Sequence, residues 1–231
     1  VRDGVFDDVD IAISWHPAPF SGVNPAHSLA ILQVDYSFTG RSSHAAAAPE
    51  LGRSALDAVE LMNVGVNYLR EHMPLDCRVH YAITNSGGVS PNVVQAEAEV
   101  LYLIRGPRVK EARALLDRVK ACAEGAAIMT GTRMSMEIDK ACSDTIPNTA
   151  LEMRMHENLL RLGPPCFDEA DRRFAADLRR SLSEEDIADS IAAVGAPEEV
   201  GAQPLHEGVL PFDGDAAGQR AAFRAVERVL P

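Results

Sequence analysis

Basic residues are scarce in this 231-residue sequence. It has 22 Lys and Arg against 34 Asp and Glu, which gives a net charge of −12. Because nucleic acid is bound through clusters of Lys and Arg, this balance excludes nucleic acid as the main partner. Long hydrophobic runs are also missing, since the longest stretch almost free of charge, residues 11–36, is interrupted by Pro17, Pro19, Gly22 and Pro25. We therefore expect no membrane span, no membrane partner and a cytoplasmic protein.

Paired cysteine motifs and a leader segment are absent as well. The four cysteines (Cys77, Cys122, Cys142 and Cys166) are widely spaced without a CxxC pair, which is typical of small buried thiols in a reducing compartment. No basic-then-hydrophobic signal opens the chain. The chain starts at Val1, and residues 9–14 already have the pattern of a buried strand. We therefore expect a fragment of a longer protein.

From Leu29 onward the hydrophobic pattern predicts a compact domain. Four segments alternate hydrophobic and polar residues as half-buried strands do, around residues 32–38, 79–83, 97–105 and 133–140. Two segments repeat hydrophobic residues at steps of three and four, which predicts amphipathic helices. The first helix begins after Ser54 as N-cap and runs through Met73 to Pro74, and the second ends at Gly131.

The predicted order is β-α-β-β-α-β, which indicates the α+β class, an α/β two-layer sandwich. We expect a four-stranded antiparallel sheet with two helices on one face. The open face would carry the polar residues Gln33, Asp35, Ser37, Ser135, Glu137 and Asp139. The expected boundaries of this domain are residues 29 and 143, with residues 1–28 before it and a helical and irregular part, 144–231, after it.

After Pro147 the sequence pattern predicts helices at residues 149–162 and 168–182, and a third helix that starts near Ser183. Residues 195–218 are rich in Gly, Pro, Ala and acid without a period, which predicts irregular loop. Residues 218–230 could form one more short helix.

Four polar residues lie where side chains often reach a ligand, although each also has a simpler interpretation. His44 precedes a helix among small residues and could donate to an oxyanion, or it is an exposed loop histidine. His16 follows an apolar strand, where ligands often lie, or it is structural. Asn92 is a candidate for binding or an ordinary turn residue. Arg105 lies at a strand end. Its guanidinium could bind a carboxylate through two parallel hydrogen bonds, or it is simply solvated.

The combination of these residues resembles a known family. The segments FTGRSSHAAAAPELGRSALDA (38–58) and SGGVSPNVVQAEAEVLYLIRGP (86–107) are similar to the lid motifs of the aminoacylase/carboxypeptidase class of two-metal peptidases. The histidine, asparagine and arginine of those motifs fall on His44, Asn92 and Arg105, while Gln95 replaces the usual proline. Two further segments, GVFDDVDIAISWHPA (4–18) and RLGPPCFDEADRRFAADLRRSLSEEDI (161–187), resemble the aminobenzoyl-glutamate type of amidohydrolase within that class.

The resemblance implies that residues 29–143 are a lid or dimerisation domain, flanked by pieces of an α/β metallopeptidase catalytic domain. Those pieces would be residues 1–28 and the helical and irregular remainder, 144–231.

This resemblance also implies a role for each candidate. His44 would be catalytic, reaching into the active site of a partner chain and stabilising the oxyanion formed when metal-bound water attacks an amide. Asn92 and Arg105 would bind substrate, with Arg105 on its free carboxylate, and His16 would hold a metal. The complete enzyme would carry two divalent metal ions, zinc or manganese. It would be a homodimer or a dimer with a homologous chain, and its substrate would be a small N-acyl amino acid.

The sequence also departs from the family. The first metal-binding segment and the paired glutamates, one of them the general base, normally precede the region where this chain begins. The late metal-binding histidine is not recognisable either, and we do not assign its role to His206. We therefore expect metal-dependent hydrolysis of an amide such as that of p-aminobenzoyl-glutamate in the complete enzyme, and little metal binding or activity in this fragment alone. The alternative is a non-catalytic dimerisation module.

Overall fold

The computed structural model describes residues 3–23, 28–193 and 196–212 of the chain. These residues divide into two compact units. The sheet unit consists of residues 28–147, and the helical unit combines residues 3–23 with residues 148–212.

Four antiparallel strands form the sheet, in the order β2-β3-β1-β4. The strands are β1 (Ala30–Thr39), β2 (Arg78–Asn85), β3 (Glu97–Gly106) and β4 (Arg133–Cys142). β1 is an inner strand and pairs with β3 along its whole length, from Ala30 opposite Gly106 to Thr39 opposite Glu97. Its other edge pairs with β4, and a bulge at Gln33/Val34 shifts that register.

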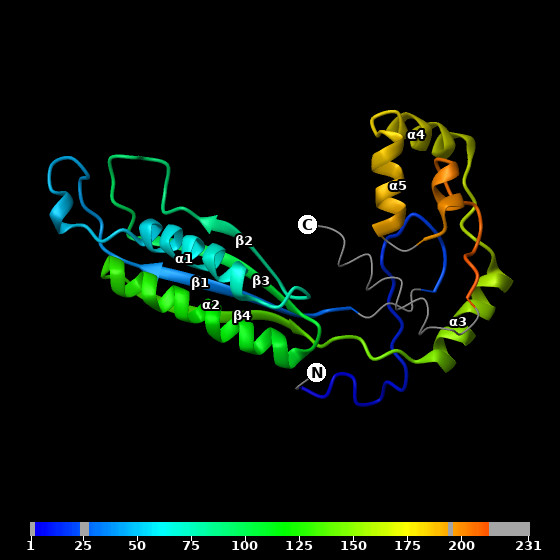
Figure 1. Cartoon of the computed structure of the whole chain (residues 1–231), viewed down its shortest axis with the longest axis horizontal. Coiled ribbons are helices and arrows are strands. Elements are labelled where there is room, and N and C mark those ends of the chain that lie inside the picture. The colour runs from blue at the N-terminus through cyan, green and yellow to red at the C-terminus, as the bar shows by residue number, and fades with distance from the viewer. Residues whose placement is uncertain (1–2, 24–27, 194–195, 213–231) are drawn as a thin grey trace. The chain divides into compact units, whose positions relative to one another are not determined.

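Two helical connections place α1 (Ala55–Leu69) and α2 (Val109–Thr130) against the strands (Figure 1). The predicted N-cap is confirmed, because the Ser54 hydroxyl accepts a hydrogen bond from the Asp57 amide at 3.0 Å. α1 ends at Leu69, earlier than predicted, and a 3₁₀ turn (Arg70–His72) follows it. α2 ends at Thr130, and its C-cap Gly131 has a φ of +65°, the left-handed conformation that favours glycine. The predicted α+β class and element order are confirmed.

One face of the sheet forms the core with the helices. Every second residue of β1 and β3 is buried there, namely Leu32, Val34, Tyr36, Phe38, Ala98, Val100, Tyr102 and Ile104. Burying these side chains against α1 and α2 is the main driving force for this unit. Neither of these helices covers the other face, and its predicted polar residues are exposed or half-buried. Gln33 Nε2 donates to Asp139 Oδ2 there at 2.6 Å.

The helical unit contains α3 (Thr149–Leu162), α4 (Glu169–Arg179), α5 (Glu184–Ala193) and a 3₁₀ turn (Glu198–Ala202) within the segment predicted to be irregular. Asp168 and Asp171 form a capping box that starts α4. The bidentate pair of Arg172 with Glu207, with N–O distances of 2.9 and 3.1 Å, joins α4 to the segment that follows the turn. The predicted helix at 218–230 lies outside the described residues.

Two sequence-based expectations are wrong. Residues 9–14, predicted to be a buried strand, form no strand, and their hydrophobic side chains are exposed, including Ile13 at 71%. A strand needs a hydrogen-bonding neighbour, and no described residue supplies one for this segment. The four cysteines are unpaired as expected, but Cys142 and Cys166 are exposed rather than buried. Within the described ranges, every helix is too short or too polar to cross a bilayer.

A buried hydrogen bond offers a test of how α1 is held on the sheet. The Tyr102 hydroxyl donates to Asn63 Oδ1 at 2.5 Å, and both side chains are buried. Tyr102→Phe leaves the amide oxygen without its partner, so we expect the free energy of unfolding to fall by about 1–2 kcal/mol in urea denaturation. Tyr81→Phe, at an exposed tyrosine that stacks on Tyr102, is the control and should change stability by less than about 0.5 kcal/mol. Equal losses in the two variants would contradict this assignment.

Candidate functional site

Two loops leave the same end of the sheet and are held together by their main chains. The first joins β1 to α1 (residues 40–54), and the second joins β2 to β3 (residues 86–96). Three amide-to-carbonyl hydrogen bonds connect them: Gly40 to Ala96 at 2.7 Å, Ala45 to Asn92 at 2.9 Å and Val94 to Ser43 at 3.0 Å. We call residues 40–54 and 86–96 the loop pair. It brings His44 and Asn92 to one place.

A glycine allows the first loop to fold back on itself. Arg41 and Arg53 exchange two main-chain hydrogen bonds, at 2.8 and 2.9 Å, which close the loop at its base. A Cβ at Gly40 would lie 1.9 Å from the Arg53 carbonyl oxygen, so any side chain at this position would force the base open. The glycine that precedes His44 is therefore needed for the shape of the loop that presents it.

His44 is exposed, and its ring is oriented by the main chain that follows it. The amides of Ala46 and Ala47 both donate to its Nδ1, each at 3.2 Å. Because Nδ1 accepts hydrogen bonds, the neutral ring carries its proton on Nε2. Nε2–H is thus the hydrogen-bond donor of an exposed ring that is followed in the sequence by four alanines. This geometry suits donation to a negatively charged oxygen.

Asn92 is also exposed, on the second loop of the pair. Its Oδ1 accepts a hydrogen bond from the Ser90 hydroxyl at 2.6 Å, so the amide oxygen is in use and the NH₂ group is the outward donor. The hydrogen bond from Ala45 to the Asn92 carbonyl joins this residue to the His44 loop. The loop pair therefore presents two donor side chains, and the carboxylates that form ion pairs among the described residues all lie elsewhere.

Arg105 lies at the opposite end of the sheet. In the β1–β3 ladder it pairs with Ile31, whereas the loop pair begins beyond Thr39 and Glu97. About eight residues of antiparallel strand separate these positions by roughly 25 Å. The Arg105 side chain is half-buried, and its Nε is buried without a hydrogen-bond partner among the described residues. The structure therefore brings His44 and Asn92 together and keeps Arg105 apart from them.

Arg105 has a neighbour that the sequence motifs did not point to. Arg78 on β2 lies directly opposite it, and His80 lies two residues further along β2 on the same open face. Burial and the charges of Arg105, Arg70 and Arg78 lower the pKa of His80 below its ordinary value of 6.5. We call Arg78, His80 and Arg105 the basic corner. Only the strand register reveals it, because Arg78 and Arg105 are far apart in sequence.

His16 is exposed and lies in the helical unit. Its Nδ1 donates to the neighbouring Pro17 carbonyl at 2.7 Å, so Nε2 is the nitrogen that could bind a metal. Among the described residues, no group of three or more His, Cys, Asp or Glu side chains is arranged to hold a metal ion. His16 alone does not make such a site.

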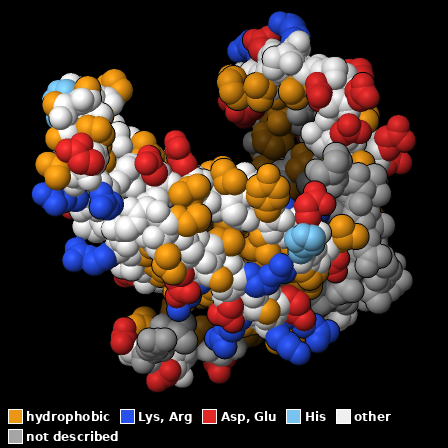
Figure 2. All heavy atoms as spheres, turned by 60° about the vertical axis from the view of Figure 1, so that its left-hand side comes forward, with side chains coloured by type: hydrophobic (Ala, Val, Ile, Leu, Met, Phe, Trp, Pro, Cys, Tyr) orange, Lys and Arg blue, Asp and Glu red, His pale blue; other side chains and the backbone are white. Residues whose placement is uncertain are grey.

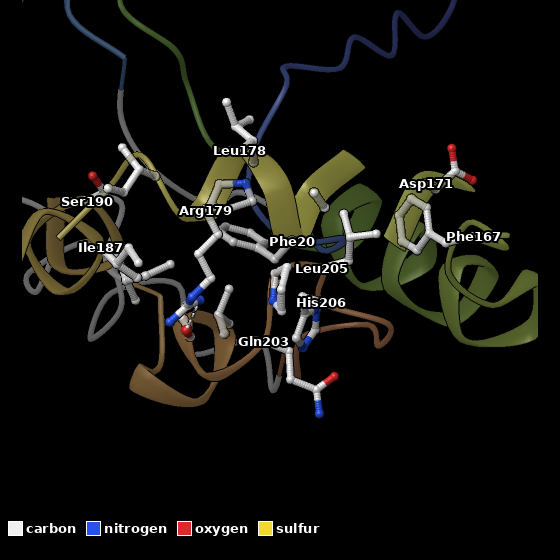
Figure 3. Close-up of a pocket in the computed structure, with 18 of the residues that line it drawn as sticks. Phe20, Phe167, Asp171, Leu178, Arg179, Ile187, Ser190, Gln203, Leu205 and His206 are labelled. Carbon is white, nitrogen blue, oxygen red and sulfur yellow. Dashed lines mark hydrogen bonds between the residues drawn. The ribbon is translucent and has the colours of Figure 1, made fainter. Parts of the chain in front are cut away.

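The helical unit contains a cavity of about 520 Å³ (Figure 3). Its lining is mainly hydrophobic and includes Phe20, Phe174 and Leu205. Arg179 also lines it, and its guanidinium donates to the Gly201 carbonyl at 2.7 Å. His206 contributes a buried Nδ1 without a partner in the described part of the chain, but no carboxylate or cysteine cluster accompanies it there. The lining fits hydrophobic atoms better than a metal ion.

Comparison with known proteins assigns the sheet unit to a family. Residues 30–128 match the peptidase dimerisation domain. The chain is 50% identical to one of the subunits of p-aminobenzoyl-glutamate hydrolase of Escherichia coli over 196 residues, which cover 85% of this chain and 41% of that protein. It is 34% identical to Xaa-Arg dipeptidase of Mus musculus over 172 residues, covering 73% and 39% of the two chains. The chain therefore spans less than half the length of these relatives.

A solved structure shows the same fold. The crystal structure of an aminobenzoyl-glutamate utilization protein from Klebsiella pneumoniae aligns with 97% of this chain and 49% of its own, with a TM-score of 0.52 and 21% identity. At that level of identity the likeness concerns the fold alone. The family resemblance expected from the lid motifs is confirmed.

The basic corner predicts an unusual titration of His80. Its pKa should lie below 6.5, as measured from the ring proton shifts in an NMR pH titration. Arg105→Gln removes a nearby positive charge, which makes protonation of the ring less costly and should raise the pKa toward 6.5. Arg108→Gln, at an exposed arginine three residues along, is the control and should leave the pKa within about 0.2 of the unmodified protein. A fall in the pKa on removal of Arg105 would contradict the proximity of these groups.

Proposed function

Residues 30–128 belong to the peptidase dimerisation domain family, and from this premise we propose that the chain is the lid-bearing part of a metal-dependent amidohydrolase. The complete enzyme hydrolyses the amide bond of an N-acyl amino acid such as p-aminobenzoyl-glutamate. The 50% identity to a chain of the Escherichia coli p-aminobenzoyl-glutamate hydrolase supports this substrate class. All four cysteines are unpaired, which supports a cytoplasmic location.

The orientation of His44 is the observation that carries the proposal. Two main-chain amides occupy its Nδ1, so its exposed Nε2–H is held as a donor. When an amide carbonyl is attacked, its oxygen gains negative charge, and a donor already in place stabilises that charge without reorganising. His44 is the catalytic residue that donates to this oxygen, and the Asn92 side-chain amide binds a substrate oxygen nearby.

The separation of Arg105 from the loop pair supports an active site shared between two chains. An N-acyl amino acid is shorter than the roughly 25 Å between these positions, so one substrate cannot reach both within one chain. In our proposal each active site takes His44 and Asn92 from one chain of a dimer and Arg105 from the other. Arg105 binds the free carboxylate of the amino acid, for which a guanidinium provides two parallel hydrogen bonds.

The described residues do not fit a complete two-metal centre. Such a centre needs several carboxylate and imidazole ligands around a shared water, and these residues offer only His16 without a cluster around it. In our proposal His16 binds one of the two divalent ions, zinc or manganese, through Nε2, and the other ligands lie outside the described residues. This chain alone should bind metal weakly and hydrolyse little.

The partner in our proposal, a second copy or a homologous chain, binds at the free edge of β2. The sheet has two edges, and they differ in character. β4 exposes Arg133, Glu137 and Lys140 beside Ile138, and charges along an edge discourage pairing. β2 exposes Tyr81 and Ile83, and its one Lys, Arg, Asp or Glu residue is Arg78 at the start of the strand. Hydrophobic side chains are visible at the surface in Figure 2. Pairing two β2 edges across a two-fold axis would extend the sheet from one chain into the next.

A non-catalytic dimerisation module is the second candidate. It is favoured by one observation, the lack of a metal-binding cluster among the described residues. A metal titration of this chain, followed by an assay with p-aminobenzoyl-glutamate, separates the two candidates. Tight binding of two metal ions per chain together with turnover would exclude the module.

Removal of the His44 ring tests its catalytic role. In a hydrolytically active preparation that contains this chain, we expect His44→Ala to lower kcat by about 10²–10³-fold and to leave the metal content unchanged, because the variant loses a donor to the oxyanion and no ligand. His72→Ala, at an exposed histidine near the other end of the sheet, is the control. Loss of metal from the His44 variant would show that the role is assigned wrongly.

Two matched substitutions test the edge at which the chains associate. Ile83 on β2 and Ile138 on β4 are similarly exposed, at 45% and 48%. Ile83→Lys should turn dimers into monomers in sedimentation equilibrium, because it buries a charge at the proposed interface. Ile138→Lys should leave the dimer intact. Dissociation caused by the β4 variant alone would place the interface at the other edge.

A further inference from the structure

Three arginines gather at the base of the loop pair. Arg41 and Arg53 face each other there and exchange two main-chain hydrogen bonds, at 2.8 and 2.9 Å, so their Cα atoms are about 5.5 Å apart. Arg133 begins β4 opposite Thr39, which precedes Arg41 by two residues. All three arginines are exposed. We call Arg41, Arg53 and Arg133 the arginine cluster.

The Arg53 side chain connects the two parts of this cluster. Its Nη1 donates to the carbonyl oxygens of Glu50 at 3.1 Å and Gly52 at 2.5 Å. A Cβ at Gly131 would lie 3.2 Å from the Cδ and Nε of Arg53, so this side chain lies against the C-cap of α2. Arg133 follows that C-cap by two residues. The fold therefore holds the first loop of the loop pair and the start of β4 together, with their positive charges on one end of the sheet unit.

The arginine cluster has no carboxylate partner among the described residues. Glu50 in the first loop and Glu97, which lies opposite Thr39 on β3, are nearby, but neither of them forms an ion pair with it. Like charges that face each other across two strands are destabilising, and Arg41 and Arg53 are such a pair. Positive charge with this cost and without a partner in the described part of the chain suits an anionic surface from outside the sheet unit.

The acidic charge of the protein is concentrated in the helical unit. The described residues of that unit hold 17 Asp and Glu against 6 Arg, whereas those of the sheet unit hold 14 Asp and Glu against 12 Lys and Arg. The net charge of −12 therefore comes almost entirely from the helical unit. The arginine cluster is complementary in charge to the helical unit of a second copy of this chain.

Within the helical unit, the segment that carries His16 has acidic residues and no basic ones. Residues 3–23 contain four Asp and no Lys or Arg. Three of these carboxylates, on Asp7, Asp8 and Asp10, are exposed, and none of them belongs to an ion pair among the described residues. This segment therefore offers three carboxylates to a basic partner.

We propose that the arginine cluster binds residues 7–10 of a second copy of this chain and thereby positions the loop pair on the helical unit of that copy. The inference rests on the proposed function, in which His44 of one chain acts beside His16 of the other. Arg41 is at most about 11 Å of chain from His44, and Asp10 is at most about 22 Å of chain from His16. Contacts between guanidinium and carboxylate groups would fix the orientation in which the loop pair meets the other chain.

Carbodiimide coupling of the whole chain tests this contact without requiring hydrolysis, because it joins a lysine amine to a carboxylate in contact with it. Arg41→Lys keeps the charge and supplies the amine. In an equimolar mixture of ¹⁵N-labelled and unlabelled chains, we expect mass spectrometry to find position 41 of one chain linked to Asp7, Asp8 or Asp10 of the other. Arg108→Lys, at an exposed arginine near the other end of the sheet, is the control and should give no link to these residues.

An exchange of charges gives a second measurement. Arg41→Asp and Asp8→Arg should each weaken the dimer about fivefold or more in sedimentation equilibrium at low salt, because each brings like charges together. The variant with both changes should recover to within about twofold of the unmodified chain, because it restores opposite charges with the partners exchanged. Arg108→Asp should leave the dimer unchanged.

The failures of the two proposals are distinguishable. The docking contact is wrong if position 41 is linked only within its own chain, only to another acidic segment such as residues 184–186, or to no carboxylate. It is also wrong if the variant with both changes stays as weak as the single ones. In each of these cases a loss of kcat in the His44→Ala variant still supports the shared active site. If the unmodified chain forms no dimer, the shared active site fails as well.

Discussion

The antiparallel ladder between β1 and β3 is the constraint on which the arrangement of the sheet unit depends. Its unbroken residue pairing aligns the end of β1 with the start of β3, so the loops that carry His44 and Asn92 leave the sheet at the same end. The same ladder places Arg105 at the opposite end. A shift of one residue would turn the buried face of β1 toward solvent, so the packing against α1 and α2 also maintains this register.

The sheet unit and the helical unit differ in how well they bury their own hydrophobic residues. In the sheet unit the buried rows of β1 and β3 form one core with α1 and α2. The helical unit leaves Ile13 and Trp15 exposed in a segment that forms no strand, and Phe174 and Leu178 on α4 are exposed as well. The sheet unit therefore has one continuous core, whereas the helical unit keeps large hydrophobic side chains at its surface.

On β2 and β3 the charges of the open face are separated along the strands. Arg78 and Arg105 lie at one end, and Glu97 and Glu99 lie toward the loop pair. Positive charge gathered on neighbouring strands makes the electrostatic potential at this end of the sheet more positive. The donors of His44 and Asn92 lie at the other end, so the two kinds of binding group belong to different ends of the unit. This separation is why two chains are invoked for one active site.

The sequence by itself was sufficient for the sheet, its two helices and the Ser54 N-cap, because period-two and period-3.6 patterns and capping residues are local signals. It also identified His44, Asn92 and Arg105 as candidates through motif resemblance. Only the tertiary structure decided that the amides of Ala46 and Ala47 orient His44 and that Arg105 lies far from it with Arg78 opposite. It also showed residues 9–14 without a strand neighbour among the described residues. These outcomes depend on strand register and on partners distant in sequence, which no local pattern encodes.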